Sequence, residues 1–342
     1  MNEPVTCVIG GGPAGLTSAL TLSNQGSKVV LVERTGRLGG KPATFCCKAD
    51  DVCRWCGVCH VNRMIDTVTK NLHIELCLDS EVAQLQSNDH GFNIQIRSRD
   101  GVNREVACDY LVWAGGYQLF DASLKPAYGY GRYPNVVTSI ELDQMLLEKD
   151  LPIRHSDNRS PRSFAFIQCT GSRDIRLGAD YCSQVCCASS VRLANLLKYR
   201  CRECDVSIFR MDVQSPNRPF DLLLSELDIS IKFIDALPGE VLPLSNGNLL
   251  LNYPNASTST TESLEVEMVV LAIGIRPQII PQIILETLNL KTTGSGFLNS
   301  VSDSSRVAVA GTATGPMSIA NTMIHARSAV NLMWARTHGV RL

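Results

Sequence analysis

The stretch that decides the fold reads TCVIGGGPAG and occupies residues 6–15. Residues 6–9 are apolar and predict a strand, while residues 16–24 after the glycines predict a helix. A GxGxxG pattern between a strand and a helix is typical of a dinucleotide-binding fold, whereas the same glycines alone would indicate only a loop. The sequence therefore predicts an α/β fold that binds a dinucleotide at this turn.

Each glycine of the motif has a physical task. Gly10 permits the tight turn, Gly12 lets a pyrophosphate approach the backbone, and Gly15 lets the helix pack closely on the strand. The pyrophosphate then meets the N–H groups at the start of the helix, beside Pro13 and Ala14. We expect all five residues to line the cofactor site.

A carboxylate follows at the spacing that this fold requires. The apolar run 28–32 predicts a second strand, and Glu33 comes directly after it, about 20 residues beyond the glycines. At this place a carboxylate accepts hydrogen bonds from the hydroxyls of an adenosine ribose. Glu33 is therefore a predicted cofactor-binding residue.

Length and composition predict a globular protein of about two domains. The chain has 342 residues, of which 44% are hydrophobic and 19% charged, so each domain can bury a core. The formal net charge is -1, from 32 basic and 33 acidic residues. Because the strong positive field that draws proteins onto nucleic acid is absent, we expect no nucleic-acid partner.

The apolar segments predict neither a membrane span nor a targeting signal. The longest apolar run, residues 266–275, is interrupted by Glu267 and Gly274 and is far too short to cross a bilayer of about 30 Å. No charged region precedes the first strand, so we expect a cytoplasmic protein. In that reducing compartment, fourteen cysteines favour metal or redox chemistry over structural disulfides.

Four later segments resemble the FAD-contacting parts of two-dinucleotide-fold flavoproteins. Residues 34–40 resemble the loop over the pyrophosphate and flavin, residues 110–116 and 270–277 resemble the two crossing strands, and residues 307–316 resemble the closing FAD motif. Many such proteins carry an acid where this chain has Thr312, so its hydroxyl or backbone N–H is expected to serve the ribityl chain. The resemblance implies FAD, bound also by Arg34, Gly39, Gly40, Ala114, Gly115, Gly311, Thr312 and Met317.

The same resemblance implies a thioredoxin/disulfide reductase-like architecture with two dinucleotide-binding folds. Residues 1–150 and 270–342 are expected to form a discontinuous FAD-binding domain, into which residues 151–269 are inserted as a second α/β domain. In disulfide and thioredoxin reductases this insert binds NAD(P)H through its own glycine loop. Here a strand over 163–168 and a helix over 191–199 are predicted, but no GxGxxG lies between them.

Cysteines occupy the place of the missing glycine loop, at positions 169, 182, 186 and 187. Four thiolates from one loop suit an iron–sulfur cluster, which could exchange single electrons with a flavin. Zinc is the alternative metal, although zinc sites usually have two separated CxxC pairs. Ordinary buried thiols are the third interpretation. We expect no nicotinamide nucleotide to bind here.

Over nearly the whole chain the residues resemble the heterodisulfide reductase flavoprotein (the A component) of methanogens, which has relatives in sulfur-oxidising bacteria. The resemblance implies FAD and a nearby [4Fe-4S] cluster held by Cys169, Cys182, Cys186 and Cys187. Methanogen versions add an N-terminal domain and ferredoxin-like insertions, so this chain is similar to the short form of bacterial sulfur-oxidation complexes. The segments that carry the resemblance are residues 10–15, 38–40, 56–59, 133–136 with Glu141, 169–174, 181–182, 186–187 and 311–316.

Two features limit what the resemblance implies. Methanogen members have a lysine near the flavin where this chain has Arg192, which keeps the charge but differs in shape and hydrogen bonding, so electron bifurcation is not inferred. We retain Glu141 and Arg192 as predicted cofactor-binding residues. A second cysteine group could hold another cluster, form a redox-active disulfide, help the first site or consist of free thiols; its members are Cys46, Cys47, Cys53, Cys56 and Cys59.

Three functions are compatible with these motifs. The first is a flavin hub that passes electrons between FAD and the cluster to other subunits of a heterodisulfide reductase-like complex, in sulfur oxidation. The second is a stand-alone disulfide reductase that uses Cys53, Cys56 or Cys59, and the third is a redox sensor. The missing nicotinamide loop favours the hub, because a stand-alone reductase needs a hydride source. We further expect a homodimer.

Overall fold

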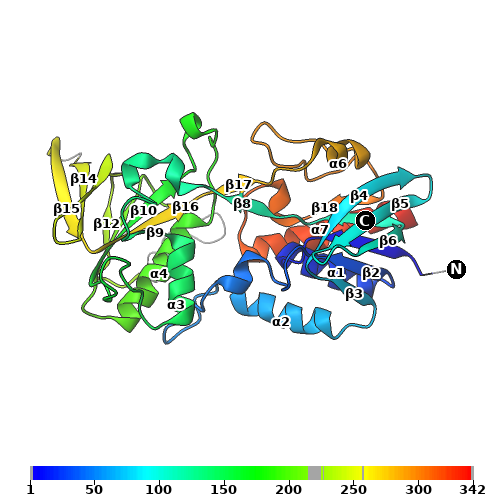
Figure 1. Ribbon diagram of the computed structural model, residues 1–342, viewed down its shortest axis with the longest axis horizontal. Helices are drawn as coiled ribbons and strands as arrows, with labels where there is room; N and C mark the ends of the chain where they lie inside the picture. The colour runs from blue at the N-terminus through cyan, green and yellow to red at the C-terminus, as the bar shows by residue number, and fades with distance from the viewer. Residues whose placement is uncertain (1–2, 215–224, 226, 256–257, 340–342) are drawn as a thin grey trace. The chain divides into compact units, whose positions relative to one another are not determined.

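The computed structural model describes residues 3–214, 225, 227–255 and 258–339. These residues form two compact units (Figure 1). The first unit consists of residues 1–43, 57–118 and 277–342, and the second of residues 44–56 and 119–276. Where the chain passes between the units, β8 (Tyr117–Leu119) pairs with β17 (Ile275–Pro277).

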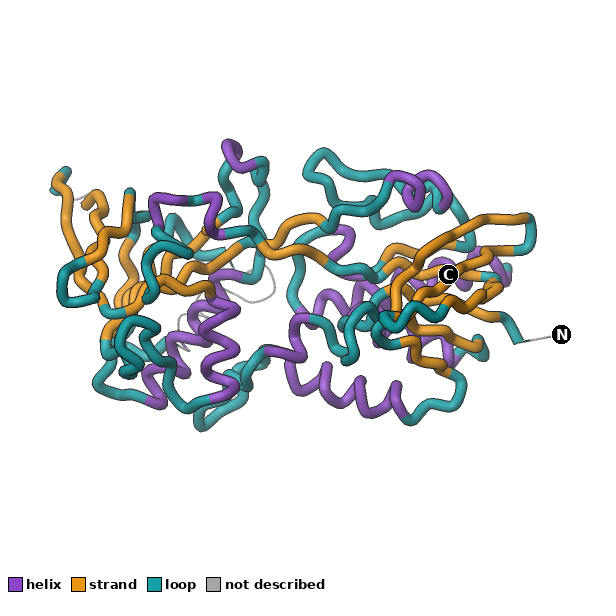
Figure 2. The backbone as a smooth tube through the Cα atoms, viewed as in Figure 1, coloured by secondary structure: helices purple, strands orange, loops and turns teal. Residues whose placement is uncertain are grey.

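The first unit is built on a parallel five-stranded sheet with the order β18-β7-β1-β2-β3. Figure 2 shows strands in orange and helices in purple in both units. A separate antiparallel sheet, β4-β5-β6, follows β3 in the chain. The strands are β1 (Val5–Ile9), β2 (Lys28–Val32), β3 (Ile74–Cys77), β4 (Ser80–Asn88), β5 (Gly91–Ser98), β6 (Asn103–Cys108), β7 (Tyr110–Trp113) and β18 (Val307–Val309). The helices are α1 (Pro13–Asn24), α2 (Val58–Thr69), α6 (Gln282–Thr287) and α7 (Ile319–His338), with short 3-10 turns η1 (Lys41–Thr44) and η5 (Gly311–Thr314).

The second unit repeats this plan. Its parallel sheet has the order β12-β11-β10-β16-β9, and an antiparallel sheet, β13-β14-β15, precedes β16 in the chain. The strands are β9 (Val136–Thr138), β10 (Ser163–Thr170), β11 (Asp205–Phe209), β12 (Lys232–Ile234), β13 (Glu240–Pro243), β14 (Leu249–Asn255), β15 (Thr260–Val266) and β16 (Met268–Ile273). The helices are α3 (Ser139–Glu148) and α4 (Cys186–Arg200), with 3-10 turns η2 (Ala122–Leu124), η3 (Pro126–Tyr128) and η4 (Ile175–Leu177).

Alternation along the central strands explains why each sheet is covered on both faces. In β10, Phe164 and Phe166 pack into one apolar cluster with α3 and α4, while Ala165 and Ile167 pack into another with β13–β15. In β1, Val8 packs with the helices and Cys7 packs with the antiparallel sheet. Both faces of each sheet are thus buried, as parallel sheets require.

The second unit begins earlier in the chain than the predicted boundary at residue 150. Residues 119–150 belong to it because β9 pairs in parallel with β16 and α3 packs against the same sheet. Residues 44–56 also belong to it, because Asp143 on α3 forms a buried ion pair with Lys48. Its other boundary lies after Arg276, beyond the predicted residue 269.

Local signals fix the ends of the helices. Thr138 and Glu141 form a capping box at the start of α3, and Ser318 accepts a hydrogen bond from the N–H of Asn321 at the start of α7. Gly339 ends α7 in the left-handed conformation, with φ 66°. No helix within the described residues is long and apolar enough to cross a membrane.

Candidate functional site

The glycine turn between β1 and α1 leaves no room for side chains at two positions. Gly10 has φ +107°, and a Cβ built on it would lie 2.3 Å from the carbonyl oxygen of Ala114. A Cβ on Gly15 would lie 1.7 Å from the carbonyl oxygen of Gly10. Both contacts are with backbone, which cannot rotate away, so the turn requires glycine at both positions.

The start of α1 is open toward a ligand. Gly12 is the N-cap residue, no side chain caps the helix, and Pro13 occupies the first turn. The nearest atom to a Cβ built on Gly12 is the Cα of Gly40, at 3.9 Å, so the space beside Gly12 is free of closer atoms. Helix N-termini carry N–H groups without intrahelical partners, among them that of Ala14, and these suit a phosphate.

Glu33 lies directly at this turn. Its Oε2 accepts a hydrogen bond from the Gly11 N–H at 2.7 Å, and its Oε1 accepts from the N–H and hydroxyl of Thr35 at 2.9 and 2.8 Å. Only 8% of the residue is exposed. The three donors hold the carboxylate in one orientation beside the glycines, as the predicted ribose contact requires.

The segment 34–40 folds back over the glycine turn. The Gly39 N–H donates to the carbonyl oxygen of Gly11 at 2.8 Å, and a Cβ on Gly40 would lie 3.1 Å from the Cα of Gly12. Arg34 is exposed at the start of this segment. After it, Lys41 donates to the carbonyl oxygen of Tyr117 at 2.6 Å. Burial, with the nearby Arg34 charge, lowers the pKa of Lys41.

The closing motif packs on the first turn of α1. A Cβ on Gly311 would lie 2.5 Å from the Cβ of Ala14, and the Gly311 N–H donates to Nδ1 of His325 at 3.0 Å. Thr312 is 8% exposed within η5, and Met317 immediately precedes the N-cap of α7. Gly115 follows Ala114 after β7, against the Trp113 ring. These residues fit FAD because glycines clear the space that its pyrophosphate would occupy.

In the second unit the connection from β10 to α4 has an irregular backbone. The register of β10 with β16 shifts between Ile167 and Thr170. Three non-glycine residues of the connection have positive φ: Cys169 at 56°, Arg173 at 54° and Gln184 at 61°. Such conformations persist only where surrounding structure holds them, and they cluster at functional sites. We call residues 169–187 the cysteine loop.

The cysteine loop brings its four thiols together. Each of Cys169, Cys182, Cys186 and Cys187 interacts electrostatically with the other three. Burial, followed by the neighbouring sulfurs, raises the pKa of Cys169 to about 11, and burial likewise raises that of Cys186. Thiolates that repel one another are stabilised by a cation, which is the condition that a metal centre satisfies.

Hydrogen-bond donors point at these sulfurs. The Gln184 N–H lies 3.3 Å from Cys182 Sγ, and the Gln214 N–H lies 3.4 Å from Cys187 Sγ. Cys186 and Cys187 are the first two residues of α4, whose N-terminus has no side-chain cap. Backbone donors and a helix N-terminus both favour negative charge on sulfur.

The four thiols of the cysteine loop do not form a complete coordination sphere for a metal. Among the residues that the structure describes, no group of three or more His, Cys, Asp or Glu side chains could hold a metal ion as placed. The chemistry of the donor set nevertheless fits an iron–sulfur cluster: four sulfurs, N–H donors to two of them, and the positive charge of Arg173 near Cys169.

The second cysteine group is mixed in its exposure. Cys46 is buried, Cys56 is half-buried, and Cys47, Cys53 and Cys59 are exposed, all as free thiols. Burial raises the pKa of Cys46 to about 12. The group is split between the units, since residues up to 56 belong to the second and Cys59 to the first.

Arg192 and Glu141, the other predicted cofactor residues, make structural contacts in the second unit. Arg192 on α4 donates from Nε to the carbonyl oxygen of Arg54 at 2.9 Å, and so holds the segment that carries Cys53 and Cys56. Glu141 accepts from the Thr138 N–H at 2.6 Å and from the Tyr130 hydroxyl at 2.9 Å. These contacts anchor a loop and cap a helix; cofactor binding by either residue stays a prediction.

Three contributors were missed by the sequence reasoning. Thr35 orients Glu33, and its place two residues later in a turn was the available signal. Arg173 places its positive charge near Cys169, and no sequence pattern indicated this. The third is the pair Cys201 and Cys204, a disulfide in the structure, whose CxxC spacing was visible in the sequence.

Comparison with known proteins supports a flavin site in the first unit. Residues 6–114 match the family model for FAD dependent oxidoreductase. The solved structure of T. acidophilum thioredoxin reductase has a TM-score of 0.66 at 15% identity, covering 98% of this chain and 100% of that one. The predicted two-dinucleotide, thioredoxin reductase-like fold is therefore confirmed.

Two curated relatives match most of the chain, and each is the A component of a heterodisulfide reductase. That of the H(2):CoB-CoM heterodisulfide,ferredoxin reductase of Methanothermobacter thermautotrophicus is 26% identical, over 94% of this chain and 62% of that protein. That of the ferredoxin/F(420)H(2)-dependent CoB-CoM heterodisulfide reductase of Methanosarcina acetivorans is 26% identical, over 91% and 50%. The chain spans less than two thirds of either relative. The predicted resemblance and the predicted class, oxidoreductase, are confirmed.

Proposed function

We propose that this protein is a flavin electron-transfer subunit that binds FAD in the first unit and a [4Fe-4S] cluster on Cys169, Cys182, Cys186 and Cys187. The observation that supports the proposal is that Cys186 and Cys187 form the first turn of α4, that backbone N–H groups donate to Cys182 and Cys187, and that the four thiols influence one another electrostatically. In the first unit the equivalent turn is a glycine cradle for a phosphate. A thiol-lined turn in the second unit supplies metal ligands instead.

The residues of the chain have separable tasks in this proposal. The N-terminus of α1 binds the pyrophosphate, Glu33 binds the ribose, and Gly40 keeps the covering segment close to Gly12. The cysteine loop supplies thiolate ligands, and its N–H donors stabilise their charge. FAD exchanges electrons singly or in pairs, and a [4Fe-4S] cluster exchanges them singly. The two groups together can therefore couple two-electron transfer to one-electron transfer.

Partner subunits complete the proposed activity. The relatives are components of heterodisulfide reductases, and the chain spans only part of their length. We place it in a heterodisulfide reductase-like complex of sulfur oxidation, in the cytoplasm, with a homodimeric flavoprotein core. Electrons then reach the flavin from a partner or the cluster, because the cysteine loop stands where a nicotinamide nucleotide would need glycines.

Cofactor content tests the proposal directly. The protein is purified anaerobically, and flavin, iron, acid-labile sulfide and zinc are measured. We expect about one FAD and four iron atoms per chain, as one [4Fe-4S] cluster requires. Zinc at full occupancy with iron near zero would overturn the cluster, and a doubled iron content would place a second cluster on the Cys46–Cys59 group.

Reduction by nicotinamide nucleotides tests the hub against the stand-alone reductase. The protein is mixed anaerobically with NADH or NADPH in a stopped-flow instrument, with dithionite as the positive control, and flavin absorbance is followed. We expect bleaching by dithionite alone. Rapid, saturable bleaching by either nucleotide would reject the hub and favour a disulfide reductase that uses Cys53, Cys56 or Cys59.

A further inference from the structure

A pair of cysteines, Cys201 and Cys204, lies at the opposite end of α4 from the cysteine loop. Cys201 is the C-cap residue of α4, and Cys204 follows it across a turn in which the Cys204 N–H donates to the Cys201 carbonyl oxygen at 3.1 Å. The two Cα atoms are 5.5 Å apart and the sulfurs are bonded. The helix has 15 residues, so about 22 Å separates this pair from Cys186 along its axis.

The turn around the pair is held independently of the sulfur–sulfur bond. The Nζ of Lys198, a residue only 9% exposed, donates to the carbonyl oxygens of Arg202 and Cys204 at 2.7 and 2.8 Å. The Cys204 N–H is fixed by the Cys201 carbonyl, and the Asp205 N–H donates to the Arg162 carbonyl oxygen at 2.7 Å. These bonds involve backbone and ammonium groups, so none of them requires the sulfur–sulfur bond.

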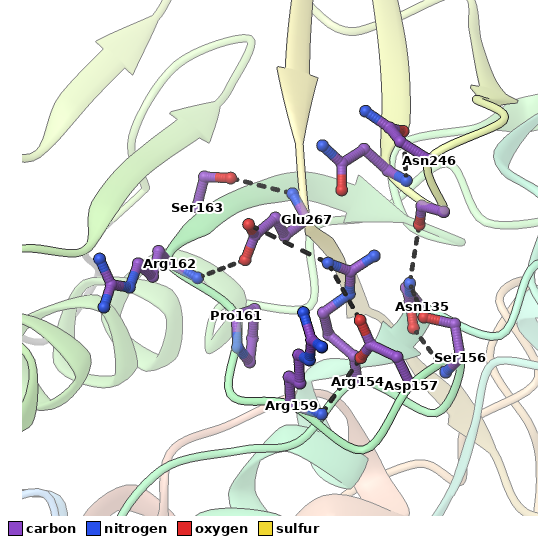
Figure 3. A network of polar contacts seen from close by, with 12 residues as sticks. Asn135, Arg154, Ser156, Asp157, Arg159, Pro161, Arg162, Ser163, Asn246 and Glu267 are labelled. Carbon is purple, nitrogen blue, oxygen red and sulfur yellow. Dashed lines mark hydrogen bonds and ion pairs between the residues drawn. The ribbon is translucent and has the colours of Figure 1, made fainter.

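Surroundings suited to a reduced thiol exist at Cys204. Its Sγ lies 3.7 Å from the carbonyl oxygen of Pro161, which can accept a hydrogen bond from the S–H. Figure 3 shows Pro161 beside Arg162, whose N–H donates to the Glu267 carboxylate at 2.6 Å. Glu267 is held in turn, because its own N–H donates to the Ser163 hydroxyl at 2.9 Å. The acceptor is thus next to a bonded network that fixes its position.

The two sulfurs differ in access. Cys201 is half-buried and is followed by two exposed residues, whereas Cys204 is 0% exposed and packs in the apolar cluster of α3 and α4. Because Cys201 is more exposed than Cys204, we expect an external thiolate to attack Cys201 first. Redox-active CxxC pairs work with this asymmetry, in which one sulfur is attacked and the other leaves.

We propose that Cys201 and Cys204 form a reversible dithiol–disulfide couple that exchanges electrons with low-molecular-weight thiols, separately from the flavin and the cysteine loop. A thiolate attacks Cys201 Sγ, the bond to Cys204 breaks, and Cys204 takes up a proton. A second thiol then attacks the external sulfur of the mixed disulfide and releases Cys201 as a thiol. Two external thiols lose two electrons and two protons to become one disulfide, and the pair gains both.

Glutathione tests the couple in the intact protein. The full-length holoprotein is equilibrated anaerobically in buffers of reduced and oxidised glutathione, quenched with acid, alkylated and digested, and the peptides are resolved by mass spectrometry. We expect Cys201 and Cys204 to change together, with the dithiol-to-disulfide ratio rising tenfold for each tenfold rise in the quotient of squared reduced to oxidised glutathione. Buried Cys7, a free thiol in β1, is the internal control and should carry no adduct.

Single variants test which sulfur is attacked. In Cys204→Ala, Cys201 should acquire glutathione, whereas in Cys201→Ala, Cys204 should acquire roughly tenfold less, because reactivity follows exposure. A pair that stays fully oxidised or fully reduced throughout the wild-type titration would overturn the proposal. Equal modification of the two single variants would do the same. Neither readout involves the flavin or iron, so both stand apart from the proposed electron-transfer function.

Discussion

The two units of this protein share a plan and differ at one turn. The order β3-β2-β1-β7 in the first unit corresponds to β12-β11-β10-β16 in the second, and each has a three-stranded antiparallel sheet before its fourth strand. In the first unit, β1 ends at Ile9 and α1 begins at Pro13. In the second, β10 ends at Thr170 and α4 begins only at Cys186.

The difference suggests how the same strand–turn–helix arrangement can bind different ligands. A strand, a turn and a helix present backbone N–H groups at the helix start whatever the turn contains. The short glycine turn leaves these groups open to a phosphate, while the longer cysteine loop fills the same place with sulfur. In the proposed function the residues of the turn select the ligand, so substitutions there should separate folding from binding.

The largest effect should come from Gly15→Ala. Its Cβ would lie 1.7 Å from the Gly10 carbonyl oxygen, so either α1 or β1 must shift. We expect destabilisation on the order of 4 kcal/mol or more, at the upper end for one substitution, together with loss of FAD. Chemical denaturation followed by circular dichroism measures the first, and flavin absorbance of the purified protein measures the second.

Gly12→Ala is the matched control for that variant. Its Cβ meets only Gly40 Cα at 3.9 Å, and the φ of Gly12 is -75°, which alanine adopts without strain. We expect unchanged or slightly higher stability, by up to about 1 kcal/mol, but weaker FAD binding because the methyl group occupies the pyrophosphate path. Equal destabilisation by the two variants would contradict the separation of folding from binding.

The loss of one charge should lower the unfolding free energy more at a buried ion pair of the second unit than at an exposed ion pair of the first. The side chains of Lys48 and Asp143 are each 4% exposed, and Asp143 also accepts from the Cys46 N–H at 2.7 Å. Asp143→Ala leaves the Lys48 ammonium buried without its partner, for which we expect a loss of about 3–5 kcal/mol in unfolding free energy. Urea titration measures it.

Asp303→Ala is the control for the buried pair. It removes an ion pair with Lys291 in which both side chains are more than half exposed, at 56% and 66%. Solvent screens such pairs, so the urea midpoint should not move measurably. Similar shifts for the two aspartate variants would show that the buried pair does not anchor residues 44–56.

A smaller effect on stability, but a large one on metal content, is expected from Cys186→Ser. Loss of a ligand should lower iron per chain at least roughly tenfold, since even partners outside the ligand set commonly contribute that much affinity. FAD should stay, because its predicted contacts at the glycine turn belong to the first unit. Cys77→Ser, at a half-buried thiol outside the cysteine loop, should retain full iron. Equal iron in both variants would remove Cys186 from the ligand set.

What the sequence could predict was local in the chain. The glycine turn, Glu33 and the cysteine loop lie within short segments, so spacing and resemblance could predict them as candidate site residues. The Lys48–Asp143 pair joins residues 95 positions apart, and no periodicity connects them. Residues 44–56 join the second unit through this and other contacts between residues distant in the chain, so their membership was not predicted.

Sequence spacing also could not predict which CxxC pair forms a disulfide. Cys201 and Cys204 form a CxxC as plain as that of Cys53 and Cys56, yet only the former are bonded in the structure. The two pairs differ in burial: Cys204 is buried within the second unit and Cys53 is exposed, and this burial depends on residues distant in the chain.

The smallest expected effect is a pH dependence at His325. Burial lowers the pKa of this histidine, whose Nδ1 accepts from the Gly311 N–H at 3.0 Å and so must be unprotonated in the native state. The unfolded chain, with an ordinary pKa near about 6.5, binds the proton first as pH falls. The stabilisation is therefore complete above that pH and is lost as pH falls through the window below it. Thermal unfolding between pH 7.5 and 5.5 (about one unit to either side) should show a steeper fall in Tm for the wild type than for His325→Asn, which keeps an acceptor but does not titrate. Parallel curves would show that His325 carries no proton-linked stability.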